Sequence, residues 1–244
     1  VVIDTVRYRL GRSGFGSGHL GHVAEPYAFK PSPYSSHGRI LQMLQGRSPM
    51  RILDVGCGPG WLAKALTDAG HTVVGVDIAA AEGVTQRMSR FVRADLADGI
   101  PDDVGGDFDL VLAADIIEHL PNPARLLSDM AGRVRPLGSI IASVPNISHW
   151  YPRFRITAGR FDYDQRGVLD ETHLRFFTRR RFLRVAEEAG LEEVSFRHTG
   201  LPLDALGLSG STVVTGTIGR ADRLLVSVWP TMFAYQFVYE FTPW

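Results

Sequence analysis

Cysteine, net charge and long apolar runs are scarce in this 244-residue sequence. Cys57 is the only cysteine, which excludes an internal disulfide and fits a reducing compartment. The 26 basic residues balance the 26 acidic ones, so the chain lacks the overall positive charge that is typical of nucleic-acid-binding proteins. We therefore expect no nucleic-acid partner.

The longest nearly uncharged stretch covers residues 224–241, and Pro230 interrupts it. The interruption comes before the stretch reaches the roughly 20 apolar residues that a membrane-spanning helix needs. The first residues do not combine a basic start with an apolar signal core. These features predict a chain with no membrane span and a cytoplasmic location.

Aromatic residues recur at alternate positions after that proline, at Phe233, Tyr235, Phe237, Tyr239 and Phe241. This period of two is typical of a strand with one large apolar face. Core packing is the main interpretation of that face. Contact with a second copy of the chain, a membrane or a partner protein is the alternative, so a homodimer remains open.

Apolar stretches alternate with amphipathic ones along the chain, which predicts an α/β domain with parallel crossovers. A hydrophobic content of 45% and a length of 244 residues fit one large core. The expected strands are residues 51–55, 72–77, 90–93, 108–114 and 138–144. The expected helices lie near residues 35–45, 60–69, 79–88, 122–134 and 178–189.

The most informative motif is a run of three glycines at alternate positions, Gly56, Gly58 and Gly60. Glycine adopts backbone angles that a Cβ forbids and lets a ligand lie against the main chain. Asp54 precedes the first glycine by two residues, and a helix begins near Trp61 with its first amides facing the same crevice. The arrangement indicates a nucleoside-binding loop.

Spacing separates the two cofactors that use such loops. The dinucleotide fingerprint would require a glycine at position 61, where this chain has the bulky Trp61. The next apolar stretch ends in Asp77, a carboxylate placed to bind two ribose hydroxyls. NAD is therefore disfavoured, while a ribose-containing ligand is retained.

The pattern Asp-x-Gly-x-Gly-x-Gly resembles the first motif of class I S-adenosylmethionine (SAM) methyltransferases, and the resemblance extends over most of the chain. Residues 90–96 resemble the third strand and its acidic end, residues 107–123 the fourth strand and following loop, and residues 169–178 a block of bacterial methyltransferases found with glycosyltransferases. The subgroup also includes ubiquinone-biosynthesis O-methyltransferases. The resemblance implies a Rossmann-like, doubly wound sheet of seven mostly parallel strands, with an antiparallel last strand and helices on both faces.

The resemblance implies SAM as cofactor. In this family the glycine loop holds the methionine part, the acid after the third strand binds the adenine amino group, and the helix before the first strand covers the cofactor. Cys57 is interpreted as a small residue in the loop, with a nucleophilic role as the alternative. The residues expected to bind SAM are Tyr34, His37, Asp54, Gly56, Cys57, Gly58, Gly60, Asp77, Ile78, Asp95, Leu96, Ala114 and Asp115.

Residues 145–184 form too long a connection to be a simple turn, and we expect the acceptor there. Segment 145–155 mixes aromatic and polar residues, which suits stacking on a ring while hydrogen bonding its edges. Nine arginines face four acids in the whole region, so a phosphorylated, uronic or nucleotide-linked acceptor is one interpretation and a solvated surface is the other. We assign an acceptor-binding insertion to residues 145–177.

Methyl transfer to a hydroxyl requires in-line alignment and a base that removes a proton. Histidine fits this role, and the candidates are His119 first, then His149 and His173. Each of them also has a purely structural interpretation. Asp115, Glu118 and His119 have spacing suited to a hard divalent cation, but we expect no metal requirement.

The sequence therefore predicts a SAM-dependent O-methyltransferase for a small sugar-containing or anionic metabolite. N-methylation of an amino sugar or another amine is an alternative within the same class. A non-catalytic SAM-binding module of a glycan-assembly complex is the alternative from another class. We expect a lead-in or lid at residues 1–34 and one methyltransferase domain at residues 35–244.

Overall fold

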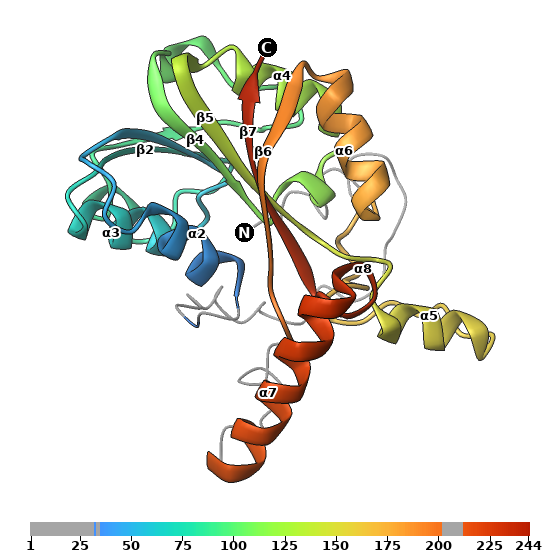
Figure 1. Cartoon of the computed structure of the whole chain (residues 1–244). Helices are drawn as coiled ribbons and strands as arrows, with labels where there is room; N and C mark the ends of the chain where they lie inside the picture. The colour runs from blue at the N-terminus through green and yellow to red at the C-terminus, as the bar shows by residue number, and fades with distance from the viewer. Residues whose placement is uncertain (1–31, 33–34, 202–211) are drawn as a thin grey trace.

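The computed structural model describes Ser32, residues 35–201 and residues 212–244 (Figure 1). The expected lead-in, apart from Ser32, lies outside the described residues, as does Tyr34. The strands are β1 (Arg51–Val55), β2 (Thr72–Asp77), β3 (Arg90–Arg93), β4 (Phe108–Ala114), β5 (Val134–Pro145), β6 (Leu191–His198) and β7 (Gln236–Pro243). The α-helices are α2 (Ser36–Leu44), α3 (Trp61–Asp68), α4 (Pro123–Ala131), α5 (Trp150–Thr157), α6 (Arg179–Glu188), α7 (Thr212–Val228) and α8 (Pro230–Phe233).

All seven strands form one sheet in the order β3-β2-β1-β4-β5-β7-β6. Strands β1 to β5 are parallel, whereas β7 is antiparallel to both β5 and β6. The chain leaves β1 toward β2 on one side and later returns to β4 on the other. This reversal of strand order opens a crevice at the carboxyl ends of β1 and β4, where ligands bind in such sheets. The predicted fold class is confirmed.

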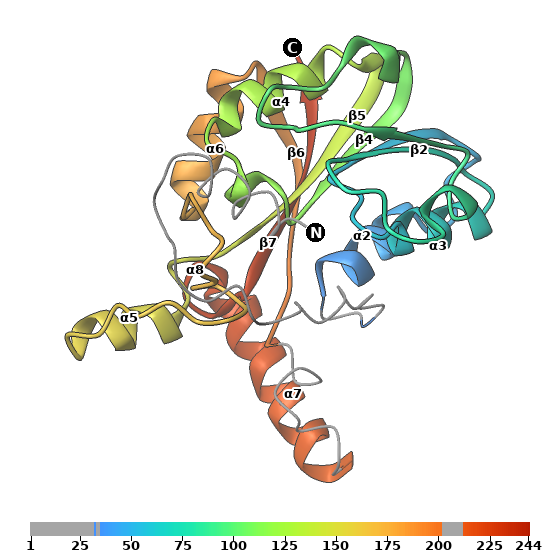
Figure 2. The ribbon, with the colours of Figure 1, turned by 180° about the vertical axis from the view of Figure 1, so that it is seen from behind.

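Two apolar layers hold the helices against the sheet (Figures 1 and 2). On one face, Ile40 of α2 and Leu66 of α3 pack with Ile52 of β1. On the other face, Leu127 of α4 and Phe182 of α6 belong to the larger cluster. Burial of both helix layers fixes the loops at the sheet edge that carry the candidate site. Among the described residues, no helix has the length and apolar character needed to cross a membrane.

The expected helix at residues 79–88 is wrong. Only one 3-10 turn, η1 (Val84–Gln86), forms in this connection. The amide of Ala79 donates to the Asp77 carboxylate, and Gly83 adopts a positive φ of 72°, so the backbone leaves helical geometry before and at that point.

The aromatic face near the carboxyl end is core, as predicted. Phe237, Tyr239 and Phe241 of β7 are fully buried between β5 and β6. The strand is shorter than the alternation indicated, because Phe233 belongs to α8 and Tyr235 precedes β7. The sequence analysis predicts no element at the residues that form strand β6 and helices α5 and α7.

Candidate active site

The glycine loop joins β1 to α3 at the carboxyl edge of the sheet, and its glycines all have positive φ: 74° at Gly56, 54° at Gly58 and 80° at Gly60. A Cβ on Gly56 would lie 2.5 Å from the side chain of Ile116, so this glycine permits close packing of the loop after β4. A Cβ on Gly58 would meet no atom within 4 Å. Gly58 therefore borders open space, where a ligand can approach the main chain.

Asp77 ends β2 directly beneath this loop. Its Oδ2 accepts a hydrogen bond from the Gly58 amide at 2.9 Å, and its Oδ1 accepts one from Ala79 at 3.2 Å. Burial raises the pKa of the Asp77 carboxyl, and the backbone amides oppose that rise. The carboxylate thus fixes the loop through hydrogen bonds within the chain.

Asp54 is the second buried acid at the loop, with 2% of its surface exposed. Its Oδ2 has no hydrogen-bond partner among the described residues. Burial, together with the charge of Asp77, raises the pKa of Asp54 to about 7. A bound cation would favour the ionised form of this carboxyl.

Cys57 is buried within the same loop, and its Sγ would lie 2.8 Å from a Cβ on Gly75. Burial raises the pKa of the thiol, which keeps the sulfur protonated and poorly nucleophilic. Small size and close packing account for this residue, as we had favoured.

The remaining cofactor candidates lie after β2, after β3 and at the end of β4, at the same edge of the sheet. Asp95 is partly exposed and accepts a hydrogen bond from Ala97 at 2.9 Å, whereas Leu96 is buried in the core. Ile78 follows β2 and is partly exposed, and Ala114 is the buried last residue of β4. Asp95 and Ile78 are therefore accessible to a ligand, while Leu96 and Ala114 support the edge from below.

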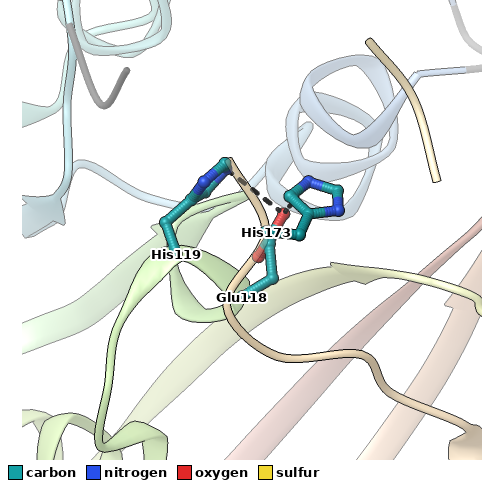
Figure 3. A group of neighbouring side chains, drawn as sticks. All are labelled: Glu118, His119 and His173. Atoms are coloured by element: carbon teal, nitrogen blue, oxygen red, sulfur yellow. Dashed lines mark ion pairs between the residues drawn. The ribbon is translucent and has the colours of Figure 1, made fainter. Parts of the chain in front are cut away.

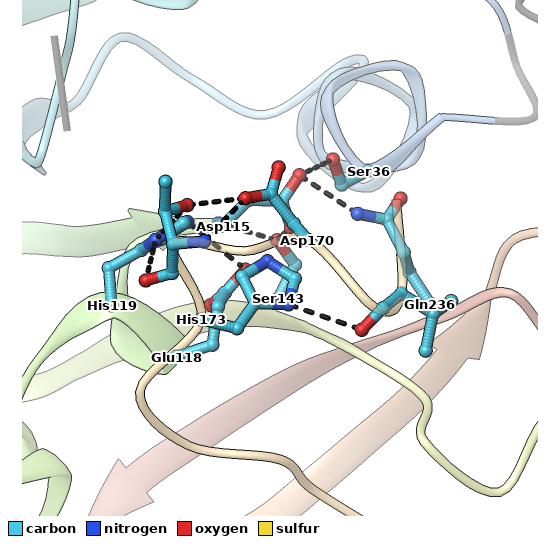
Figure 4. Close-up of polar contacts among 10 residues, drawn as sticks. Ser36, Asp115, Glu118, His119, Ser143, Asp170, His173 and Gln236 are labelled. Atoms are coloured by element: carbon cyan, nitrogen blue, oxygen red, sulfur yellow. Dashed lines mark hydrogen bonds and ion pairs between the residues drawn. The ribbon is translucent and has the colours of Figure 1, made fainter. Parts of the chain in front are cut away.

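Asp115 follows β4 in a strained backbone conformation, with φ at 55°. Its carboxylate accepts hydrogen bonds from Ser36 at 2.6 Å, Ser143 at 2.5 Å and Gln236 at 2.9 Å (Figure 4). These donors belong to α2, β5 and β7, so Asp115 ties the start of α2 to the sheet. His37, the next residue of α2, is buried at the same place.

Glu118, His119 and His173 converge beside this network (Figure 3). Oε1 of Glu118 lies 4.0 Å from Nε2 of His119 and 3.9 Å from Nε2 of His173. The two imidazole rings meet edge to face, with their centroids 4.8 Å apart. Nδ1 of His119 lies 3.1 Å from the Thr172 carbonyl oxygen, and Nδ1 of His173 lies 3.2 Å from that of Val168. Both rings are thus oriented by the main chain.

Backbone hydrogen bonds hold the segment that carries His173 against the turn that carries Glu118 and His119. The amides of Leu174 and Arg175 both donate to the Glu118 carbonyl oxygen, at 2.9 and 3.0 Å. The loop before α6 is therefore fastened to the turn η3 (Ile117–His119) after β4. The sequence spacing alone did not indicate this pairing.

Burial favours the uncharged form of every group in the cluster. It raises the pKa of Glu118 well above its usual range, and the charge of Asp115 adds to the rise. It lowers the pKa of His119 to about 4, helped by His173, and it also lowers the pKa of His173. Both imidazoles are consequently uncharged at pH 7, with Nδ1 facing a carbonyl oxygen and Nε2 left as the acceptor atom.

Glu118, His119 and His173 are also the group that could hold a metal ion in the described part of the chain, since their ligand atoms lie within 4.8 Å of one another. The sequence spacing offers Asp115 with Glu118 and His119 as the candidate set, but Asp115 does not belong to this group. The reason is that the Asp115 carboxylate already accepts three hydrogen bonds from side chains.

His149 makes its contacts elsewhere. It caps α5, with Nδ1 accepting the Tyr151 amide at 3.3 Å, and its ring lies 5.4 Å from Trp150 and 5.6 Å from Tyr235. Its Nε2 has no partner among the residues that the structure describes. Burial lowers its pKa to about 4. A capping role explains the position of this histidine.

Replacing His149 by glutamine should change how stability depends on pH. In the unfolded chain His149 has a pKa near 6.5, whereas burial lowers its pKa in the folded protein to about 4. Between these two pH values the unfolded state binds a proton that the folded state does not bind, so the protein loses stability as the pH falls through this range. From pH 7 to pH 5 this loss amounts to about 2 kcal/mol. Chemical unfolding at both pH values should show the variant gaining that amount relative to the unmodified protein. A constant difference between the two proteins would contradict the buried neutral state.

Ion pairs reduce the cationic character that we expected of residues 145–184. Arg155 contacts Asp164 at 2.6 Å and Tyr151 at 2.8 Å, and Arg179 contacts Glu193 at 2.9 Å. The exposed arginines of this region are Arg153, Arg160, Arg166, Arg175, Arg180, Arg181 and Arg184.

A row of aromatic rings leads from the surface to the histidine pair, and our sequence reasoning missed it. Phe161 and Tyr163 are about half exposed, and each has its ring centroid near that of Phe176, at 6.1 and 6.3 Å. The Phe176 ring lies 6.1 Å from His173, which in turn meets His119. The aromatic residues at 161, 163 and 176 were visible in the sequence, but their irregular spacing matches no regular element.

Comparisons with known proteins agree with this geometry. The profile of a family described as "Methyltransferase domain" matches residues 34–195. The ubiquinone biosynthesis O-methyltransferase of Bordetella avium is 30% identical over 184 residues, covering 70% of this chain and 73% of that protein. The enzyme of the same name from Idiomarina loihiensis is 27% identical over 167 residues, covering 65% and 68%.

Solved structures show the same fold at low identity. The magnesium protoporphyrin IX methyltransferase of Synechocystis PCC 6803, with bound S-adenosylhomocysteine (SAH), aligns over 98% of this chain and 95% of its own, with a TM-score of 0.58 and 16% identity. The 1,6-didemethyltoxoflavin-N1-methyltransferase of Burkholderia thailandensis aligns over 88% and 79%, with a TM-score of 0.56 and 17% identity. Fold and glycine loop together define a class I SAM-dependent methyltransferase. The chain belongs to the methyltransferase domain family.

Proposed function

We propose that this enzyme transfers the methyl group of SAM to a hydroxyl oxygen of a small acceptor that carries a sugar or an anionic group. The pair of uncharged imidazoles, His119 in the turn after β4 and His173 in edge-to-face contact with it, carries the proposal. The relatives from Bordetella avium and Idiomarina loihiensis, which are named O-methyltransferases, support methylation of oxygen.

The cofactor is proposed to lie across the loop after β1. Gly58 offers open main chain to it, Asp54 receives the ammonium of the methionine part, and Asp77 binds the ribose hydroxyls. Asp95 is proposed to accept a hydrogen bond from the adenine amino group. His37 of α2 is proposed to cover the ligand, together with Tyr34, which lies outside the described residues.

The acid–base chemistry is assigned to His119. The acceptor oxygen attacks the methyl carbon in line with the carbon–sulfur bond, an oxygen–carbon bond forms as the carbon–sulfur bond breaks, and the hydroxyl proton moves to the imidazole. The products are the methyl ether and SAH. The Thr172 carbonyl holds the ring of His119, and His173 supports it from the side.

The acceptor is proposed to enter along the aromatic row. Phe161, Tyr163 and Phe176 offer ring faces on which a sugar or another ring can stack. Arg160 and Arg166 are exposed in the same segment of the chain as Phe161 and Tyr163, and their side chains are suited to a phosphate or carboxylate on the same molecule.

Turnover with matched acceptor pairs tests the substrate class. Glucose 1-phosphate and uridine diphosphate glucose are compared with methyl glucoside, and SAH formation is measured together with the mass and alkali stability of the product. A charge-assisted arginine contact should raise kcat/KM by about tenfold or more for the phosphorylated acceptors.

Other outcomes of this assay would contradict the proposal. Equal kcat/KM for charged and neutral acceptors would contradict the proposal that the acceptor carries an anionic group. A product methylated on nitrogen, from glucosamine 1-phosphate in the same assay, would favour the amine alternative. SAH binding without turnover of any acceptor pool would favour a non-catalytic binding module.

A further inference from the structure

Strand β6 is the last strand on one side of the sheet and lies beside β7 (Figure 1). Within the described part of the chain, no other strand pairs with its outer edge. The backbone groups of such an edge are a template for pairing with another chain, unless side chains prevent it. The side chains of β6 therefore decide what this edge can bind.

The backbone of β6 directs hydrogen-bonding groups outward. Thr199, just after the strand, faces β7: its amide donates to the Gln236 carbonyl oxygen and its carbonyl oxygen accepts the Tyr235 amide, both at 3.0 Å. Successive residues of a strand direct these groups to alternate sides, so Phe196 directs its own away from β7. The Phe196 carbonyl oxygen accordingly accepts the guanidinium of its neighbour Arg197, at 2.9 Å.

Two exposed side chains of opposite charge, Glu192 and Arg197, lie on one face of this edge strand. Residues five apart on a regular strand lie on opposite faces, but a bulge in the middle of β6 adds one residue. Glu192 therefore lies opposite Thr242 of β7 and Arg197 opposite Val238, which are four residues apart and so share a face. Among the described residues, neither side chain has an ion-pair partner.

We propose that β6 pairs antiparallel with β6 of a second copy of this chain, about a twofold axis at Ser195. Ser195 lies opposite Glu240 of β7, midway between the positions of Glu192 and Arg197. The axis therefore places Glu192 of each copy opposite Arg197 of the other. Opposite charges that face each other across two strands stabilise the pair, and this pairing gives two such contacts.

The same register fits the backbone. Glu193 lies opposite Phe241 of β7 and Phe196 opposite Tyr239, so the two residues are equally distant from Ser195. Their β7 partners are two residues apart, so both direct their backbone groups to the outer side. Phe196 of one copy then faces Glu193 of the other, and opposite residues of this kind exchange two hydrogen bonds in an antiparallel ladder.

The charges also favour a second copy over other occupants. An exposed glutamate and an exposed arginine disfavour pairing with an unrelated strand, whereas the reversed copy of β6 matches both of them. Since β6 runs parallel to β1–β5, antiparallel pairing directs the two candidate sites to opposite ends of the joined sheet. The inference does not depend on which acceptor is methylated.

Sedimentation velocity of the full chain over a wide range of concentration tests the proposal. The unmodified protein should form a reversible dimer. Glu192→Arg places an arginine opposite Arg197, and Arg197→Glu places a glutamate opposite Glu192, so each variant should raise the Kd of its dimer at least about tenfold. An equimolar mixture of the two variants should dimerise like the unmodified protein, because every arginine then faces a glutamate.

The matched control is Arg90→Glu, which reverses an exposed charge on β3, the edge strand at the other side of the sheet. Its dimer should keep the Kd of the unmodified protein, and all variants should keep their circular dichroism spectrum. A monomer at every concentration would overturn the proposal. So would a dimer that is insensitive to both β6 variants, a dimer that Arg90→Glu weakens equally, or a mixture of the two folded β6 variants that stays monomeric.

Discussion

Replacing His119 by glutamine is expected to lower kcat by about 10²- to 10⁴-fold, which is the usual contribution of a positioned general base. Glutamine keeps the approximate volume and a hydrogen bond to the Thr172 carbonyl but cannot accept the acceptor proton at neutral pH. SAH affinity should stay within a factor of about two, because the proposed cofactor contacts lie on other residues. Single-turnover kinetics and calorimetry measure the two effects separately.

Two controls make the assignment specific. His149→Gln should reduce kcat far less, since His149 caps α5 and contacts neither His119 nor His173 in the contacts described. Dialysis of the unmodified enzyme against EDTA should leave turnover unchanged. Loss of turnover on chelation, restored by a divalent ion, would show that His119 acts as a metal ligand with Glu118 and His173 and would overturn the base assignment.

Replacing Gly58 by alanine is expected to weaken SAH binding by about 10- to 100-fold. The added methyl group would occupy the open space bordering the loop, and filling a close-packed contact costs about 1–3 kcal/mol. The positive φ of 54° adds backbone strain to the folded protein. Isothermal calorimetry with SAH measures the affinity.

Gly46→Ala is the matched control for Gly58→Ala. Gly46 also has a positive φ, 78°, and a Cβ there would also meet nothing within 4 Å, but it lies in the turn after α2. Its alanine variant should lose similar stability and keep full SAH affinity. Equal weakening of SAH binding by both substitutions would show that strain, and not blocked space, is responsible.

The parts of the fold that local sequence determines were predictable. Strands β1, β2 and β4 are short apolar runs; β2 ends in Asp77, and β1 and β4 are followed directly by Gly56 and Asp115. Strand β6 was not recognised because it lies at the sheet edge and alternates between polar and partly buried positions. Its apolar pattern is too weak to separate it from a loop.

The candidate site was predictable residue by residue but not as an arrangement. Asp54, Asp77 and His119 follow from their place at strand ends. The pairing of His119 with His173 depends on backbone hydrogen bonds to Glu118 from a loop more than fifty residues away. Asp115 has sequence spacing suited to a metal ligand, yet three side chains from distant elements donate to its carboxylate, and no local pattern records such contacts.

Calorimetric titration of the unmodified protein with SAH and, separately, with NADH tests the central claim most directly. Because the loop from Asp54 to Gly60 is proposed to bind an adenosyl sulfur compound, SAH should bind at a single saturable site and NADH should give no heat of binding. Saturable binding of NADH without binding of SAH would contradict it.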